Sequence, residues 1–332
     1  MPNHRKKHAE LFLKEGIEAP DETTTEYMRL IVDEGTLGAS RHVTLIQELF
    51  LHLADSEDEI EPLRKKLSIT GNFISETRGI DTPYIANSIR WTLRDLDQMP
   101  PEELSATIRD RSRQWATATE KRKRRILQIG ANLLKSCKTL VLFDYSSTVA
   151  ALVRHLFECG YEPTIVVFES RAISGGEPYI HELSDLNCRL HFLPDAAIEY
   201  SMTFSDAVLF GVETLRCDGS FLNTVGSKPL ARIALTYGVP VYGCTDLYKL
   251  DLSSYNGLLK SPAIRTFDGL LPEIASDNKR AATMITDCPE LEVVPSEMIT
   301  AIITEHGPIP PQAMWTLGQK IFPETETKDE YG

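Results

Sequence analysis

The sequence predicts an α/β protein with an N-terminal helical domain and a C-terminal Rossmann-like domain built on a doubly wound parallel sheet. Two observations support this. Residues 1–135 carry apolar residues at helical spacing and no convincing strand. Later residues alternate short continuous apolar runs with helical segments. Such runs are typical of strands buried on both faces, and alternation with helices favours parallel pairing.

The N-terminal half contains two amphipathic patterns and one long helix. Apolar residues at spacings of three and four predict two helices, with Leu45, Ile46, Leu49, Phe50 and Leu53 in the first and Ile85, Ile89 and Leu93 in the second. Pro83 and the pair Pro100-Pro101 interrupt this half. A long helix is expected over residues 102–135.

The C-terminal half reads as five strands separated by helices. The strands are expected at 139–143, 163–168, 188–193, 206–211 and 239–244, and the helices at 146–159, 179–186, 195–203 and 225–237. Right-handed crossovers bring the loops that follow parallel strands to one edge of the sheet, where a ligand cleft is expected. We therefore predict a helical domain over 1–135, an α/β ligand-binding domain over 136–322 and an acidic tail over 323–332.

Composition excludes several classes of protein. The 332 residues are 42% hydrophobic and 25% charged, which argues against a largely disordered chain. The net charge of −13 makes nucleic acid an unlikely partner, and the basic run at 121–125 is expected to be a solvated helix face. No apolar run reaches the roughly 18 residues that span a bilayer, and the N-terminus has no apolar signal core. A cytoplasmic location follows as an expectation.

The sequence predicts neither a metal site nor a cofactor. The six cysteines include no CxxC pair, and the histidines show no HxxxH spacing, so a zinc site is not expected. Neither a GxGxxG nor a GxxxxGK[ST] motif occurs, which argues against dinucleotide and nucleoside triphosphate sites.

Polar residues that follow the strands define the expected site. The topology places seven of them near one crevice: Ser146, Ser147, Arg171, Glu213, Asn223, Ser227 and Lys249. Gly226, Ser227 and Lys228 begin a helix, where free N–H groups favour a phosphate, and Arg171 could add a bidentate contact. Plain helix capping and a surface ion pair are the alternative interpretations of these two features.

Residues 206–251 carry most of a family pattern. Its elements are Gly211-Val212-Glu213, Asp218-Gly219, Asn223-Thr224-Val225-Gly226-Ser227 and Tyr248-Lys249-Leu250-Asp251. Three further segments fall in family order: Glu169-Ser170-Arg171, Asp195-Ala196-Ala197 and a tail at 293–311 expected to close the fold with a helix. The chain thus resembles the family of the initiation factor 2B alpha, beta and delta subunits, ribose-1,5-bisphosphate isomerase and methylthioribose-1-phosphate isomerase.

The resemblance implies a phosphorylated small molecule as ligand, either a sugar phosphate or a nucleoside monophosphate. The isomerases use a cysteine after the first strand and an aspartate in the Gly-Ala-Asp segment. Here Tyr145 falls at about the cysteine position, and Glu213 replaces the aspartate. Thr224 replaces a phosphate-binding lysine, for which Lys228 or Lys249 could substitute. Arg78 and Gly79 resemble the family's arginine–glycine loop.

These departures favour an initiation-factor-like regulatory protein that binds its ligand without turnover, because the initiation factor's alpha subunit also has glutamate and lacks the cysteine. The alternative is an aldose-1-phosphate to ketose-phosphate isomerase in which Glu213 is the acid/base and Asp144 or Tyr145 is the second group. A scaffold with an empty pocket is a third possibility. The resemblance also implies a homodimer or homohexamer, and a translation-factor partner stays open.

Overall fold

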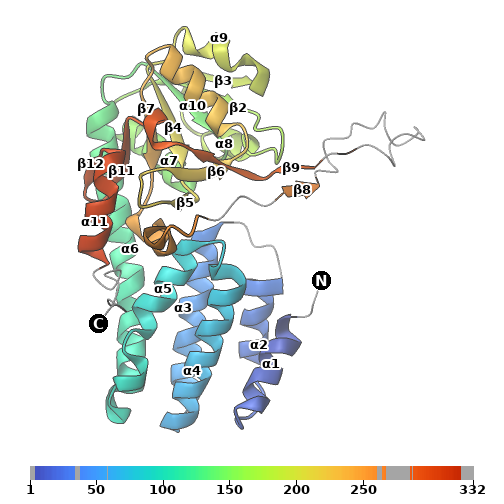
Figure 1. Ribbon diagram of the computed structural model, residues 1–332. Helices are drawn as coiled ribbons and strands as arrows, with labels where there is room; N and C mark the ends of the chain where they lie inside the picture. Colours follow the sequence, from blue (N-terminus) through green and yellow to red (C-terminus); the bar gives the residue numbers. More distant parts are fainter. Residues whose placement is uncertain are drawn as a thin grey trace. The chain divides into compact units, whose positions relative to one another are not determined.

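The computed structural model describes residues 4–33, 38–57, 59–259, 264–266, 285 and 287–322. The chain forms two compact units, Met1–Lys121 and Arg122–Gly332, that divide within the long helix α6 (Leu104–Leu134). The domain boundary expected after residue 135 follows the end of this helix, and the expected acidic tail lies outside the described residues. A helical first unit followed by a mostly parallel sheet confirms the predicted fold class (Figure 1).

The first unit is built from helices whose apolar stripes face inward. Its elements up to α6 are α1 (His4–Lys14), α2 (Glu22–Met28), the π-helical turn η1 (Arg29–Asp33), α3 (Ala39–Ser56), α4 (Ile60–Ile74), the π-helical turn η2 (Ser75–Gly79), α5 (Pro83–Leu93) and the short 3₁₀ turns Leu96–Gln98 and Pro101–Glu103. The five apolar residues that predicted α3 are all buried. Pro83 begins α5, where its missing N–H costs nothing.

The second unit is organised around a seven-stranded sheet in the order β12-β11-β7-β4-β1-β2-β3. The strands are β1 (Thr139–Phe143), β2 (Thr164–Phe168), β3 (Leu190–Leu193), β4 (Ala207–Gly211), β7 (Val241–Cys244), β11 (Ala301–Thr304) and β12 (Gly307–Ile309). All neighbours pair parallel except β11 and β12. The order reverses next to β1, so the loop after β1 lies where ligands bind in open parallel sheets.

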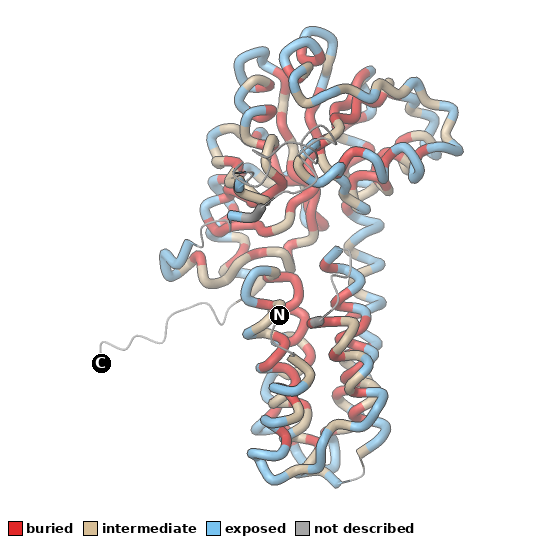
Figure 2. The backbone as a smooth tube through the Cα atoms, turned by 90° about the vertical axis from the view of Figure 1, so that its right-hand side faces the viewer, coloured by how far each residue is buried: buried red, intermediate tan, exposed pale blue. Residues whose placement is uncertain are grey.

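Helices cover both faces of this sheet because its strands alternate two apolar sets. Val141, Phe143, Val208 and Phe210 pack on one face with α10 (Ser227–Thr236) and part of α9 (Ile198–Met202). The other set, which includes Leu140 and Leu142, packs with α7 (Ser147–Glu158), part of α8 (Glu177–Glu182) and the end of α6. Figure 2 shows the central strands buried along their length, whereas the helices alternate buried and exposed residues.

The structure contains a second small sheet that was not predicted, and the tail forms strands where a helix was expected. Strands β5 (Thr214–Leu215), β6 (Phe221–Thr224) and β10 (Leu291–Val294) form an antiparallel sheet in the order β10-β6-β5. Residues 293–311, expected to close the fold with a helix, instead contribute the end of β10 and the strands β11 and β12. Two consecutive buried isoleucines, Ile302 and Ile303, explain the difference, since one joins the core on each face of the sheet. The closing helix is α11 (Met314–Ile321).

One glycine is required where β6 turns into α10. Gly226 has φ of +107°, and a Cβ atom there would lie 2.3 Å from Cζ of Phe143. Phe143 is the last residue of β1 and is fully buried, so its ring has little room to move. Gly226 therefore lets the α10 start lie directly over the end of β1.

We predict that Gly226→Ala lowers the free energy of unfolding by about 2–4 kcal/mol, because it combines a positive φ with a collision in the core. Urea denaturation followed by circular dichroism measures this change. The matched control is Gly238→Ala, which has φ of +69° but open space around the new Cβ. It should cost only about 1 kcal/mol, the conformational part alone. Equal losses in the two variants would contradict the packing role of Gly226.

Candidate functional site

Asp144 is the first residue after β1 and occupies the left-handed region of the backbone, with φ of +58°. Ser146 then caps α7, and its Oγ accepts a hydrogen bond from the Val149 N–H at 3.4 Å. The Ser146 N–H itself donates to the buried Tyr179 hydroxyl at 3.1 Å. A short polar side chain is among the few that tolerate a positive φ, so the sharp exit from the strand suits an aspartate.

The Asp144 carboxyl is enclosed by the end of β6 and by the loop after β2. Thr224 Oγ1 donates to Oδ2 at 2.6 Å, and Gly175 lies so close that a Cβ atom there would be 1.9 Å from Oδ1. Burial raises the pKa of Asp144 to about 6. Hydrogen bonds from Thr224 and the Tyr145 backbone oppose the rise, and the charges of Glu213 and Glu290 add to it. Near neutral pH this carboxyl can therefore both donate and accept a proton.

Glu213 follows β4, and its backbone is tied on both sides. Its N–H donates to the Leu222 carbonyl at 3.0 Å, and the preceding Val212 carbonyl accepts from Lys249 Nζ at 2.6 Å. Its charge adds to the rise in the pKa of Asp144. A shared catalytic role for Glu213 and the loop after β1 stays a prediction.

Tyr145 and Ser147 lie on the outer side of the same loop. The Tyr145 ring is exposed and lies 5.3 Å from the Tyr179 ring. Burial, with a smaller contribution from Glu182, raises the pKa of the Tyr145 phenol, so it stays protonated at neutral pH. Ser147 is exposed in the first turn of α7. Of the two candidates for a second acid/base group, Asp144 is the one with a pKa near neutrality.

The loop after β2 approaches Asp144 through a turn held by Asp195. The Asp195 carboxylate accepts the Ser170 and Arg171 N–H groups at 3.0 and 2.9 Å. The chain then passes Gly175, which covers the Asp144 carboxyl. The Arg171 side chain is exposed and follows β2. Its contact with a ligand stays a prediction. Sequence reasoning noted Asp195 as part of the pattern but assigned it no role.

The start of α10 differs from the expected phosphate site. Oε1 of Glu292, on β10, accepts the N–H groups of Gly226 and Lys228 at 2.6 and 2.8 Å. In this structure an internal carboxylate thus takes the place that the sequence predicted for a phosphate at these two amides. The negative charge suits a helix start for the same reason that a phosphate would. No sequence signal identified Glu292, because its pairing depends on the β6–β10 register.

Asn223 and Ser227 also point inward. Asn223 Nδ2 donates to Ser227 Oγ at 3.0 Å, and Ser227 Oγ donates to the Thr224 carbonyl at 2.7 Å. Both residues are buried. Together they fix the turn that presents Thr224 to Asp144, and a direct contact of either with a ligand stays a prediction.

Arg78 and Gly79 belong to the first unit, at the end of η2. Arg78 Nη2 lies 3.0 Å from His42 Nε2, and a Cβ on Gly79 would lie 3.3 Å from the Ala86 Cβ. The glycine therefore allows η2 to pack closely on α5. A contact of Arg78 or Gly79 with a ligand stays a prediction.

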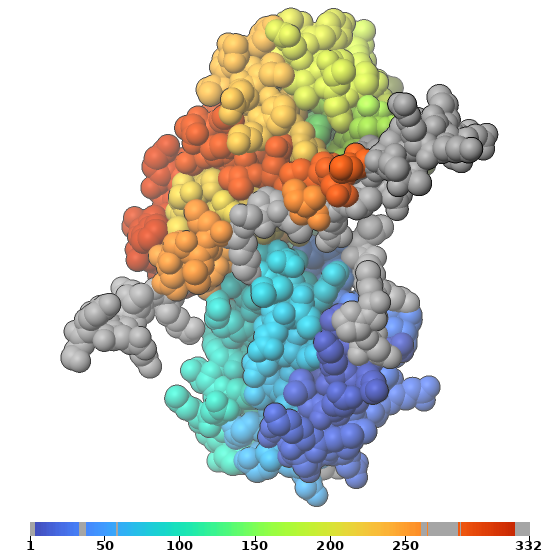
Figure 3. Space-filling view, turned by 45° about the vertical axis from the view of Figure 1, so that its right-hand side comes forward, coloured from blue at the N-terminus to red at the C-terminus, as the bar shows by residue number. Residues whose placement is uncertain are grey.

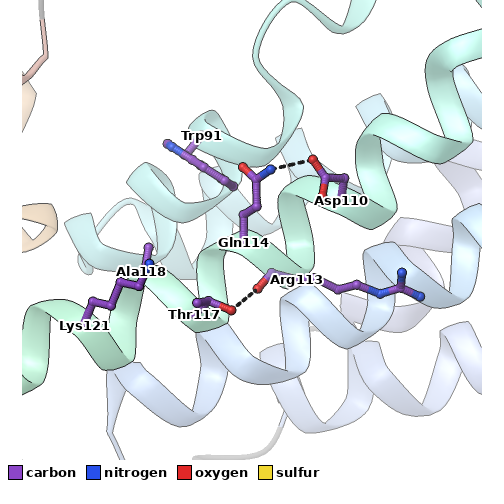
Figure 4. A pocket seen from close by; sticks show the side chains of 7 residues that line it. All are labelled: Trp91, Asp110, Arg113, Gln114, Thr117, Ala118 and Lys121. Atoms are coloured by element: carbon purple, nitrogen blue, oxygen red, sulfur yellow. Dashed lines mark hydrogen bonds between the residues drawn. The ribbon is translucent and has the colours of Figure 1, made fainter.

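A separate open groove lies between α5 and α6 of the first unit (Figure 4). It is lined by Trp91, Asp110, Arg113, Gln114, Thr117, Ala118 and Lys121. Gln114 Nε2 donates to Asp110 at 2.5 Å on its wall. None of the residues predicted from the sequence as site residues lines this groove.

The described residues offer neither a cluster of metal ligands nor a membrane-spanning helix. Among them, no group of three or more His, Cys, Asp or Glu side chains is arranged to hold a metal ion. No helix within the described ranges is long and apolar enough to cross a membrane. Figure 3 shows that the visible face of the second unit is formed by segments from the middle of the chain, coloured green to gold, and from its end, coloured orange to red.

The chain matches the model of the initiation factor 2 subunit family over residues 38–311. It is 26% identical over 268 residues to ribose 1,5-bisphosphate isomerase of Haloferax volcanii, covering 80% of this chain and 81% of the relative. It is 22% identical to the eIF2B alpha subunit of Dictyostelium discoideum, covering 66% and 70%. The structure of eIF-2B from Pyrococcus horikoshii OT3 has a TM-score of 0.72 at 21% identity and covers 88% of this chain and 98% of its own.

These relatives correct the first functional expectation. Proteins from six archaea, among them Haloferax volcanii, Haloterrigena turkmenica and Methanocaldococcus jannaschii, are named ribose 1,5-bisphosphate isomerase and match this chain. A regulator without turnover is therefore the wrong interpretation, and the isomerase alternative is better supported. The missing cysteine and the Asp-to-Glu change had argued for the regulator, but they do not exclude catalysis by other side chains at the same edge.

We predict that Asp144→Asn stabilises the protein at pH 7.5 by about 1–3 kcal/mol, because the wild type must ionise a buried carboxyl there. The folded carboxyl holds its proton up to about pH 6, whereas the unfolded chain releases it near the ordinary aspartate pKa of 3.8. Wild-type stability from this group is therefore lost as pH rises from about 4 to 6. Near pH 4 the gain in the variant should shrink to about 0.5 kcal/mol.

Urea denaturation at both pH values measures this difference, with the exposed Asp97→Asn as control. A gain that is the same at pH 4 and pH 7.5 would show that charge burial is not its cause.

We predict that Glu292→Gln lowers the free energy of unfolding by about 1 kcal/mol, because a neutral amide oxygen is a weaker partner for the α10 start. Exposed Glu297→Gln is the control for loss of a negative charge. Thermal unfolding at low and high salt separates the two. Equal effects of both substitutions would argue against the capping role of Glu292.

Proposed function

Because the chain belongs to the initiation factor 2 subunit family, we propose that it is a sugar-phosphate isomerase that converts an aldose 1-phosphate to the corresponding ketose phosphate. Ribose 1,5-bisphosphate is the first candidate substrate, because the archaeal relatives are named for its isomerisation. The observation that carries the proposal is the enclosed Asp144 carboxyl, which accepts the Thr224 hydroxyl at 2.6 Å and lies against Gly175, and whose pKa is raised to about 6.

The reaction needs two groups that exchange protons. A phosphate on C1 prevents simple ring opening, so the bond between C1 and the ring oxygen must break while that oxygen gains a proton. A base must also remove the proton on C2. Loss of that proton gives an enol across C1 and C2 that carries the phosphate at C1.

We assign the acid to Asp144 and the base to Glu213. Neutral Asp144 donates its proton to the ring oxygen as the C1–O bond breaks, and Glu213 takes the C2 proton. Glu213 then returns its proton to C1, and the Asp144 carboxylate accepts the proton of the C2 hydroxyl as the ketone forms. Both residues finish in their starting states, so the cycle balances without a cofactor.

The enclosure of Asp144 supports the acid role. Thr224 and Gly175 lie against its carboxyl and shield it from solvent in part, and a nearby ligand phosphate would raise its pKa further. Arg171 is the exposed cation at this edge and is our candidate for a phosphate contact, with Lys228 and Lys249 as further candidates. A homodimer or homohexamer stays an expectation, which sedimentation at micromolar concentration checks.

We predict that the purified protein converts ribose 1,5-bisphosphate to a ketose phosphate, followed by ³¹P and ¹H NMR. Methylthioribose 1-phosphate and ribose 1-phosphate form the other arms of the substrate assay. Glu213→Gln and Asp144→Asn should each lower kcat by about 100-fold or more. The exposed Glu297→Gln serves as control. The rate should fall as pH rises through the pKa of Asp144, and this limb should vanish in Asp144→Asn.

Two results would reject the proposal or its residue assignment. Failure of the wild type to convert any aldose 1-phosphate would exclude the isomerase. Unchanged turnover in Glu213→Gln would exclude its role as base.

A further inference from the structure

The basic run 121–125 on α6 is not uniformly solvated. Lys123 and Arg124 are exposed, as expected for a charged helix face. Arg122 instead forms an ion pair with Asp246, in which 12% and 14% of the two side chains are exposed, and its guanidinium lies 4.5 Å from the centre of the Tyr248 ring. Arg125 Nε donates to the Glu305 carbonyl at 2.9 Å. Arg122, which is half-buried, and the exposed Arg125 thus belong to a partly buried network.

Two carboxylates in this network hold one turn of backbone. The turn is the 3₁₀ segment η6 (Leu247–Lys249). The Asp246 carboxylate accepts the Tyr248 N–H at 2.7 Å, and the buried Glu305 carboxylate accepts the Leu247 N–H at 3.3 Å. Burial, followed by the charge of Asp246, raises the pKa of Glu305 to about 7, while Arg122 opposes the rise. The other charged groups acting around this network are Arg125, His306 and Lys320.

The same turn connects to the segment that carries Glu213. Lys249 Nζ donates to the Val212 carbonyl at 2.6 Å. That carbonyl belongs to the peptide group whose N–H is that of Glu213, and this N–H donates to Leu222. The Asp251 N–H donates to the Leu215 carbonyl at 2.7 Å. Both flanks of Glu213 are therefore fastened to residues 249–251.

We propose that Arg122, Asp246 and Glu305 are positioning residues that hold Lys249 against the Glu213 peptide group and thereby orient the Glu213 carboxylate. On this account, the main role of Lys249 is to position Glu213, and contact with a ligand phosphate is secondary. The consequence for rate rests on the proposed function, in which Glu213 is the base. A displacement of a catalytic group by about 1 Å can cost roughly 100-fold in rate, so a network distant from the substrate can control turnover.

Steady-state kinetics separate positioning from ligand binding. Lys249→Met and Arg122→Ala should each lower kcat about ten-fold with KM changed less than two-fold. Arg122→Lys should recover part of the loss, because it keeps the charge but not the planar contact with Tyr248. Arg124→Ala, in the same basic run and exposed, should match the wild type. A raised KM with unchanged kcat in Lys249→Met would make Lys249 a ligand contact and overturn the proposal.

Hydrogen exchange tests the link without turnover. In Arg122→Ala and Lys249→Met, amides in peptides covering 211–216 should exchange at least five-fold faster than in the wild type and in Arg124→Ala. In Arg122→Ala, amides in peptides covering 245–251 should also exchange at least five-fold faster than in the wild type. Absence of wild-type turnover would reject the proposed function alone, and faster exchange at 211–216 would still support the link. Unchanged exchange at 211–216 in both variants would overturn the inference, whatever the kinetics.

Discussion

The burial of one carboxyl group at the end of a parallel strand constrains the site more than any other interaction. Asp144 leaves β1 in a conformation that few residues accept, and its carboxyl is enclosed by Gly175 and by the Thr224 hydroxyl. Water is displaced from it, so its neutral form persists to about pH 6. The same burial costs stability and creates a proton donor, which is the usual physical relation between strain and function at active sites.

The parallel sheet brings distant parts of the chain to this carboxyl. The loops after β1, β2 and β4 meet at one edge because parallel strands all end there, and the small antiparallel sheet adds Thr224 from β6. Small residues make the meeting possible: Gly226 lies over Phe143, and a Cβ on Gly211 would lie 2.4 Å from the Ser146 Cβ. The two candidate acid/base groups are thus far apart in the chain and close in the fold.

Sequence reasoning predicted what depends on local pattern and missed what depends on pairing. Continuous apolar runs located β1, β2, β4 and β7 within a few residues. The family pattern suggested Glu213 as a site residue, and the loop after the first strand suggested Asp144. The Glu292 carboxylate at the α10 start could not be predicted, because its place depends on how β6 pairs with β10. The inward contacts of Asn223 and Ser227 were missed because they depend on the conformation of the β6–α10 turn. Arg122 looked like one of five solvated cations, since its partner Asp246 lies more than a hundred residues away.

The family comparison and the residues address different parts of the function. Some relatives are named sugar-phosphate isomerases, whereas this chain lacks the cysteine that the isomerases use, so the proposed reaction requires other proton donors and acceptors. In the proposed mechanism, Asp144 and Glu213 fill these two roles, because environment alone can divide acid from base. The relation to an initiation factor subunit is one of fold and family.

The most direct measurement is an NMR titration of the Asp144 side-chain carboxyl in the folded, full-length protein, with ¹³C-labelled aspartate and Asp144→Asn to assign the signal. The account predicts a midpoint near pH 6 that shifts to lower pH in Glu213→Gln. A midpoint at or below pH 4, or a midpoint that is unchanged in Glu213→Gln, would contradict the claim that these two groups form a coupled proton donor and acceptor.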